Sequence, residues 1–164
     1  MNCYKGRLIE YLETPELTIY TFKPKGEECL FDQFIGKFET DAVYRNDLNI
    51  ILAAIKELTK RGIDHRRFFR KKGEGPIDAI PPGNNELRLY CVPYGRNTII
   101  IGNGGVKKAL RVQDCPNCRP HWEFLIQLDA KIQDRIRSGD IVWLETNGKQ
   151  KLVGELYFEI GNCE

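Results

Sequence analysis

Cationic side chains that could bind a phosphate backbone are concentrated in one short segment of the chain. Positions 56 to 72 hold eight basic and two acidic residues, a local charge of +6, whereas the whole chain carries +2. The basic residues are Lys56, Lys60, Arg61, Arg66, Arg67, Arg70, Lys71 and Lys72. Such a cluster suits nucleic acid or an acidic protein partner. The alternative is a solvated helix end and loop, because Lys and Arg favour helix C-termini.

A second group of candidate residues lies on the strongest predicted β-hairpin and just after it. Arg88 and Tyr90 stand within its first strand, Tyr94 ends that strand, and Lys107 and Lys108 follow the second. Cleavage of RNA by its own 2′-hydroxyl needs charge stabilisation on the phosphate, which Arg and Lys supply. It also needs proton transfer, which Tyr, Lys or an acid supplies less efficiently than His. Alternatively, Arg88 is a solvent-facing strand residue that pairs with a carboxylate.

The motif Cys-Pro-Asn-Cys-Arg-Pro-His, from Cys115 to His121, places two thiols and an imidazole within one turn. Cys115, Cys118 and His121 are three possible zinc ligands, but a structural zinc site normally has four. A redox dithiol is conceivable, although no thioredoxin-like βαβ pattern surrounds it. The third interpretation is a proline-rich turn that leads into a helix. We therefore expect no metal here, and no cofactor elsewhere.

Other familiar catalytic patterns are not evident. His65 and His121 lie in different segments, and Ser138, the only serine, stands at a predicted helix end, which argues against a Ser/His/Asp triad. The glycine-rich stretch 102–107 lacks the spacing of a phosphate-binding P-loop. We expect it to end the preceding strand at Ile101 as a flexible turn or bend.

Composition indicates one globular domain over residues 1–164. Of the 164 residues 41% are hydrophobic and 29% charged, and no apolar run reaches the roughly 18–20 residues that cross a membrane. Charged residues interrupt the apolar pattern of the first 22 positions, so we expect neither a signal nor a transit peptide. This predicts a cytoplasmic protein whose six cysteines are reduced thiols.

Periodicity predicts the order of helices and strands. Two β-rich runs, 7–12 and 17–22, predict a first hairpin, and 77–80 a short strand. Apolar stripes predict a short helix over 30–38, a second with Leu48, Ile51, Leu52, Ile55 and Leu58, and a third over 121–137. We expect Thr40 or Asp41 to cap the second and Gly62 to end it.

The runs 86–94 and 98–101 predict the central hairpin, and 141–144 with 152–160 a terminal hairpin around Asn147-Gly148. The predicted fold class is α+β. We expect an antiparallel or mixed sheet against a helical hairpin, with its helices on one face and an additional C-terminal helix and β-hairpin.

The central hairpin resembles the core of the RelE/ParE toxin superfamily. In that family a helical hairpin precedes an antiparallel sheet, one middle strand carries an arginine, and the next strand is apolar and ends near basic residues. Leu87-Arg88-Leu89-Tyr90, Ile99-Ile100-Ile101 and Lys107-Lys108 match these features, most closely in the phage-derived and Bacteroidetes-type branch. The resemblance covers about residues 30–110. Residues 1–29 are then an N-terminal hairpin extension, and 111–164 supply the C-terminal helix and hairpin.

The resemblance implies a metal-independent endoribonuclease that cleaves messenger RNA, usually on the ribosome, and is held inactive by an antitoxin. Arg88 and Lys107 or Lys108 would then bind the scissile phosphate, with Tyr90 assisting at the catalytic site. The residues Arg66, Arg67, Arg70, Lys71, Lys72 and Tyr94 would bind RNA.

The chain departs from the family at its C-terminus. The final segment, 156–164, is not basic, whereas the family often completes its site with a basic or aromatic C-terminal segment. The ParE branch poisons a topoisomerase and needs no ribonuclease site. Two alternatives follow: a non-catalytic nucleic-acid- or protein-binding module of a phage or mobile element, and a structural domain that contacts an acidic protein.

Overall fold

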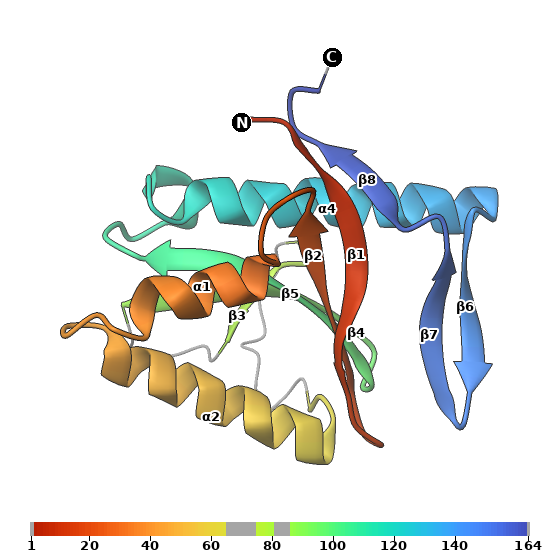
Figure 1. Ribbon diagram of the computed structural model, residues 1–164, viewed down its shortest axis with the longest axis horizontal. Helices are drawn as coiled ribbons and strands as arrows, with labels where there is room; N and C mark the ends of the chain where they lie inside the picture. Colours follow the sequence, from red (N-terminus) through yellow and green to blue (C-terminus); the bar gives the residue numbers. More distant parts are fainter. Residues whose placement is uncertain (1, 65–74, 81–85, 164) are drawn as a thin grey trace.

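A computed structural model describes residues 2–64, 75–80 and 86–163 of the chain. In this part, a mixed sheet of six strands has the order β3-β4-β5-β2-β1-β8, and β6 and β7 form a separate sheet (Figure 1). The strands are β1 (Tyr4–Glu13), β2 (Thr18–Pro24), β3 (Asp78–Ile80), β4 (Leu87–Tyr94), β5 (Thr98–Val106), β6 (Ile141–Thr146), β7 (Lys149–Gly154) and β8 (Tyr157–Ile160). The helices are α1 (Leu30–Phe38), α2 (Arg45–Arg61) and α4 (Arg119–Ser138), and η1 (Val112–Asp114) is a 3₁₀ turn. The predicted α+β class is confirmed.

The N-terminal hairpin lies inside the main sheet. β1 and β2 pair antiparallel around the turn at residues 14–17, and β2 also pairs with β5 in parallel, with Thr18 opposite Thr98. β2 and β5 are almost entirely buried because both of their faces are covered. The hairpin therefore joins the central β3-β4-β5 strands to β8 at the other edge.

Helices α1 and α2 cover one face of the sheet. The predicted apolar stripes are confirmed, since Phe34 and Ile51 are fully buried against Leu89 and Ile101 of the sheet. Gly62 ends α2 with a φ of 74°, as expected. The predicted cap at Thr40 or Asp41 is wrong by three or more positions, because Tyr44 is the N-cap residue. The Asp41 carboxylate instead accepts hydrogen bonds from the N–H groups of Val43 and Tyr44 in the preceding turn.

Helix α4 covers the opposite face, so the prediction that all helices lie on one face is wrong. Phe124, Leu125 and Leu128 of α4 pack with Val92 and Ile100 of the sheet. An amphipathic stripe shows that a helix packs against a core, but it does not specify which face of the sheet receives it. The molecule consequently has three layers, with the sheet in the middle (Figure 1).

Strand β5 continues through Gly102 to Gly105 and ends at Val106, so the predicted strand end at Ile101 is wrong. The glycines are needed because neighbouring backbone approaches closely. A Cβ on Gly104 would collide with the carbonyl oxygen of Arg88, and one on Gly105 would lie 2.6 Å from the carbonyl oxygen of Asn117. The register of β4 and β5 also shifts between Leu89 and Cys91, which marks a bulge here.

The C-terminal segment forms three strands instead of the predicted two. β6 and β7 make the expected hairpin around Asn147-Gly148, but β8 separates from β7 and pairs with β1, Tyr4 lying opposite Ile160. Gly154, with a φ of 135°, lies at the break between β7 and β8. A Cβ there would collide with the Asp140 carbonyl oxygen. Glycine is therefore required at this position, and it also adopts the positive φ of this turn without strain.

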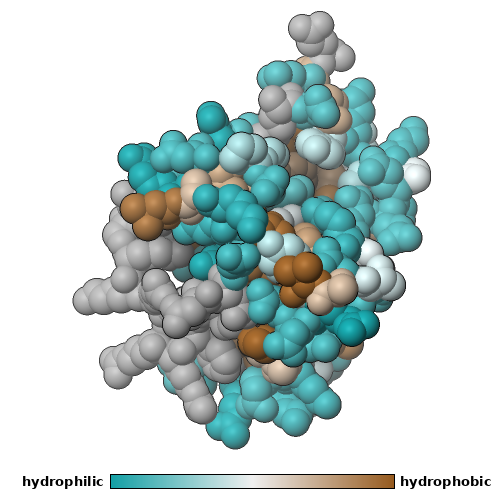
Figure 2. Space-filling model, turned by 90° about the vertical axis from the view of Figure 1, so that its left-hand side faces the viewer, coloured by the Kyte–Doolittle hydropathy of each residue, from teal (hydrophilic) through white to brown (hydrophobic). Residues whose placement is uncertain are grey.

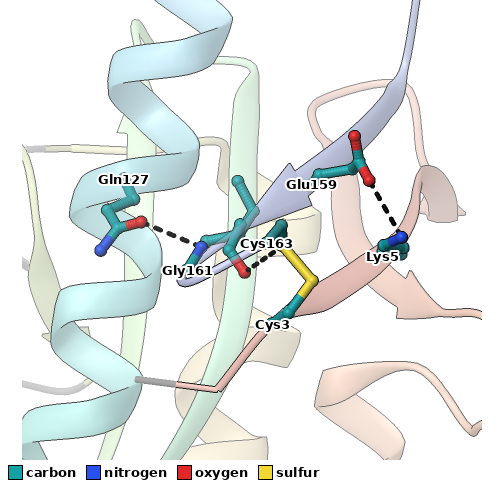
Figure 3. The surroundings of a disulfide bond; sticks show 7 residues. Cys3, Lys5, Gln127, Glu159, Gly161 and Cys163 are labelled. Carbon is teal, nitrogen blue, oxygen red and sulfur yellow. Dashed lines mark hydrogen bonds and ion pairs between the residues drawn. A yellow bond between two sulfur atoms is a disulfide. The ribbon is translucent and has the colours of Figure 1, made fainter.

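A disulfide joins the two ends of the chain, so the prediction that all cysteines are reduced is wrong. Cys3 and Cys163 are bonded across a sequence separation of 160 residues, beside the β1–β8 pair (Figure 3). Lys5 and Glu159 form an ion pair of 3.3 Å across the same two strands. Sequence alone cannot pair cysteines this distant, because their proximity depends on the β8 pairing. The other four cysteines are free thiols.

Within the described ranges, no helix combines the length and the apolar character needed to cross a membrane.

Candidate nucleic-acid interface

Arg88 lies on the α4 side of the sheet, near the start of β4. Its neighbours in the strand, Leu87 and Leu89, belong to the core on the α1–α2 side, so alternation directs Arg88 to the opposite face. Its side chain is half-buried and donates a hydrogen bond of 3.2 Å to the Leu87 carbonyl. In the ladder it stands opposite Gly105 of β5.

Lys107 and Lys108 follow directly after β5, at the same end of the sheet as Arg88. The Lys107 N–H donates to the Glu86 carbonyl at 2.7 Å, which extends the β4–β5 ladder past Val106. The Lys108 ammonium lies 3.5 Å from the Glu86 carboxylate and donates a 3.1 Å hydrogen bond to the Tyr44 hydroxyl. These two contacts, the hydrogen bond first, raise the pKa of Lys108 and keep it positively charged. The structure thus brings the three predicted phosphate-binding residues to one end of the sheet.

Figure 2 views the molecule from the side toward which β5 points. The surface is mainly hydrophilic, and apolar residues form separate patches on it. Val43 and Leu110 lie within two residues of the Tyr44–Lys108 contact and are 74% and 94% exposed. Exposed cations and exposed apolar side chains therefore occur together around this contact.

Tyr90 is buried beneath the N-terminus of α4, with only 5% of the residue exposed. Burial, together with a hydrogen bond to the Cys118 sulfur, raises the pKa of its phenol well above the ordinary value. The neutral phenol therefore persists at any physiological pH. A ligand would reach its hydroxyl only after α4 moved.

Tyr94 lies at the far end of β4, six residues from Arg88 and so roughly 20 Å away at 3.3 Å per strand residue. Its hydroxyl donates a 2.5 Å hydrogen bond to Asp129 of α4, and its ring meets Trp143 edge-on at 5.7 Å between centroids. Burial and the Asp129 contact raise its pKa. The structure does not bring Tyr94 to the Arg88 end.

Cys115 and Cys118 are buried where the loop enters α4, and Cys118 is the N-cap residue of the helix. Burial raises the pKa of Cys118 to about 11. Burial acts in the same direction on Cys115, but hydrogen bonds, the largest from the backbone of Lys108, outweigh it and lower its pKa. The motif forms a turn into a helix, one of the three interpretations of the sequence.

His121 does not join the two cysteines as a third ligand. In the described ranges no group of three His, Cys, Asp or Glu side chains is arranged to hold a metal ion. Burial, and next the charge of Lys37, lower the pKa of His121 to about 4. The imidazole is therefore neutral at pH 7 and packs at the start of α4.

Lys37 belongs to this group of side chains, although nothing in its sequence context marks it as a candidate. From the last turn of α1 its ammonium donates a 2.9 Å hydrogen bond to the Gly104 carbonyl, and burial lowers its pKa. Its charge also acts on Cys118 and His121. A helix-terminal lysine is ordinary in a sequence, and only the bulged end of β5 makes Lys37 part of this cluster.

The predicted RNA-binding residues Arg66, Arg67, Arg70, Lys71 and Lys72 lie outside the residues that the structure describes. The described part of the basic segment is the end of α2. There Lys60 and Arg61 are both exposed, and the Arg61 guanidinium pairs with Glu57 at 3.2 Å.

Comparison with known proteins yields no relative. No protein-family model matches the chain, and no curated protein or solved structure is significantly similar to it.

Proposed function

We propose that the protein is a RelE-like toxin that binds messenger RNA through Arg88, Lys107 and Lys108 and cleaves it without a metal ion. The observation that carries the proposal is the position of these three residues at one end of the β4–β5 pair, where Arg88 stands opposite Gly105 and the Lys107 N–H donates to the Glu86 carbonyl. Three basic residues at the same end of a strand pair suit the phosphates of an RNA backbone.

The arrangement of elements supports the same proposal. The helices α1 and α2 precede the antiparallel strands β3, β4 and β5, which is the order that the resemblance implies. The additional layer is α4, whose N-terminus lies beside Arg88. In this chain the phosphate would approach from the open end of the sheet, because α4 covers the face itself.

An antitoxin and the ribosome are the partners that this function requires, and the cytoplasm is where it would act. The exposed side chains of Val43 and Leu110 beside Lys108 suit a protein partner, since apolar groups next to charges are typical of such interfaces. Reducing conditions of the cytoplasm oppose the Cys3–Cys163 disulfide, so this bond would form there only transiently or after oxidation.

Binding without cleavage is the second candidate function, and the positions of the tyrosines favour it. Tyr90 is buried and Tyr94 is hydrogen-bonded to Asp129 at the other end of β4. Neither phenol is placed to transfer a proton to RNA bound at Arg88. A nuclease would then need Lys107, or a group from the segment that the structure does not describe, as its acid or base.

Induced expression in bacteria tests the proposal. The comparison uses wild type, Arg88→Ala and, as a control of equal charge change, Lys131→Ala on the exposed side of α4. Growth arrest with messenger RNA cut at mapped positions, relieved by Arg88→Ala and not by Lys131→Ala, is the expected result. Intact RNA and normal growth with abundant folded wild-type protein would reject cleavage and leave the binding function.

A further inference from the structure

A pocket of about 500 Å³ lies at the other end of the sheet from Arg88. It opens between the β4–β5 turn and the β6–β7 hairpin, and it is lined by Tyr94, Arg96, Asn97, Trp143, Glu145 and Gln150, among others. This volume lies within the range of roughly 300–1,000 Å³ that is typical of small-molecule sites.

Two aromatic rings line the pocket and hold each other in place. Tyr94 and Trp143 meet at an interplanar angle of 65°, and the Tyr94 hydroxyl is fixed by Asp129. Trp143 is half-buried, and its indole N–H has no hydrogen-bond acceptor within the described ranges. A half-exposed indole held in one orientation is a suitable surface for stacking a flat ring.

Two opposite charges line the same pocket without pairing. The Arg96 guanidinium and the Glu145 carboxylate are both exposed, and neither forms a side-chain hydrogen bond or ion pair with any residue that the structure describes. The Gln150 side chain is exposed as well, while the Asn97 amide donates to the Glu16 carbonyl at 2.8 Å. A ligand here therefore meets a cation, an anion and an aromatic face together.

The pocket is preformed because the β6–β7 hairpin is tied to β1. The Lys149 ammonium is only 9% exposed and contacts the Glu13 carboxylate at 2.5 Å, and Lys151 contacts both Glu10 and Glu13 at 2.9 Å. The Tyr20 hydroxyl also accepts a hydrogen bond from the Leu152 N–H. These contacts fix the position of Trp143 and Glu145 relative to Arg96.

We propose that this pocket binds a purine nucleotide, with its base against Trp143, its phosphate on Arg96 and its Watson–Crick edge facing Glu145. A carboxylate accepts two neighbouring N–H donors, and among the common bases guanine presents such a pair, so guanine is the preferred base. A neutral sugar would stack on Trp143 equally well, but it would leave the charge of Arg96 unmatched. The nucleotide is either free or part of an RNA strand.

The test is a titration of the full chain, with Trp143 fluorescence read in a Trp122→Phe background and calorimetry on the unaltered protein as a second readout. The probes are guanosine monophosphate, adenosine monophosphate, guanosine and a short guanine-containing RNA. We expect saturable binding of guanosine monophosphate. The RNA is compared with the monophosphate in the Arg88→Ala variant, which removes the proposed RNA contact at the other end of the sheet. Tighter binding of the RNA there would identify a strand as the source, and equal or weaker binding a free nucleotide; both results support a nucleotide pocket.

Two exposed side chains allow the two parts of the ligand to be tested separately. Arg96→Ala should weaken guanosine monophosphate about tenfold, as expected for a lost charge-assisted contact, and leave guanosine unchanged. Glu145→Gln should remove the preference for guanine over adenine. Lys131→Ala is the matched control and should change neither.

If no binding is detected at about 1 mM nucleotide, the dissociation constant is above the millimolar range, and the proposal is overturned. So would an Arg96→Ala variant that loses guanosine as strongly as the monophosphate, or binding of a neutral sugar in place of the nucleotide. Arg88→Ala should leave guanosine monophosphate binding intact. Failure of this pocket and failure of RNA binding at Arg88 are therefore distinguishable.

Discussion

Arg88, Lys37 and Cys118 come together from three separate segments at the bulged end of β5. Lys37 contacts the Gly104 carbonyl, and Arg88 stands opposite Gly105 in the ladder. Cys118 is the N-cap residue of α4, the helix that covers this face of the sheet. The charges of Lys37 and Arg88 both act on Cys118. Arg88 and Lys108 could be selected from the sequence because a strand pattern placed them on a hairpin. Lys37 could not, because its role depends on tertiary contacts.

The partly buried imidazole of His121 makes stability depend on pH. Its pKa is about 4 in the folded protein and near 6.5 when unfolded, so the unfolded chain binds more protons between these values. The free energy of unfolding should therefore fall as pH drops from 7 to 5, by about 1–2 kcal/mol from this group. Urea unfolding at both pH values measures it.

His121→Gln is the matching variant, since glutamine keeps polar atoms without titrating. Its stability should change less between pH 7 and pH 5 than that of the wild type. An identical pH dependence in both proteins would show that His121 is already solvated or charged in the folded state.

At the scale of elements, the end of β5 depends on glycines that allow backbone to approach. Gly105→Ala should lower the free energy of unfolding by about 1–3 kcal/mol, because the new methyl group would lie 2.6 Å from the Asn117 carbonyl oxygen. Equilibrium unfolding in urea measures the change.

Gly36→Ala in α1 is the control, and it is expected to raise the free energy of unfolding where Gly105→Ala lowers it. Gly36 is exposed, and a Cβ there meets nothing within 4 Å, so alanine should stabilise the helix by roughly 0.5–1 kcal/mol. If both substitutions change stability equally, the close approach at Gly105 is not present in solution.

Element boundaries were predictable where one local signal decides them. The apolar stripe of α2 and its terminal Gly62 mark that helix, and Asn147-Gly148 marks the β6–β7 turn. The continuation of β5 was not predictable, because glycines that admit neighbouring backbone look the same in sequence as glycines that end a strand. The separation of β8 was missed because its partner is β1, at the other end of the chain.

At the scale of the whole molecule, the Cys3–Cys163 disulfide closes almost the entire chain into one loop. Reducing it, or replacing Cys3 by serine, should lower the stability by about 2–4 kcal/mol, mainly through the added freedom of the unfolded chain. Titration of the oxidised protein under denaturing conditions should count four free thiols, and thermal unfolding with and without reductant measures the loss. Six free thiols in protein purified without reductant would contradict the bond.

The three-layer arrangement also lay beyond sequence reasoning. The class α+β follows from the sequence because some segments repeat apolar residues with the period of a helix and others with the period of a strand. The face that α4 covers depends instead on the length of the loop after Val106 and on the packing of Leu125 against Gly102. This layer decides which predicted residues are accessible. It buries Tyr90 and leaves Lys107 and Lys108 at the open end of the sheet.

The central claim is that Arg88 binds an RNA phosphate at this open end. Fluorescence anisotropy of a labelled single-stranded RNA, titrated with wild type, Arg88→Ala and Lys131→Ala at several salt concentrations, tests it most directly. We expect Arg88→Ala to weaken binding and to reduce the slope of log affinity against log salt by about 1, with Lys131→Ala unchanged. Equal affinity and equal slope for wild type and Arg88→Ala would contradict the claim.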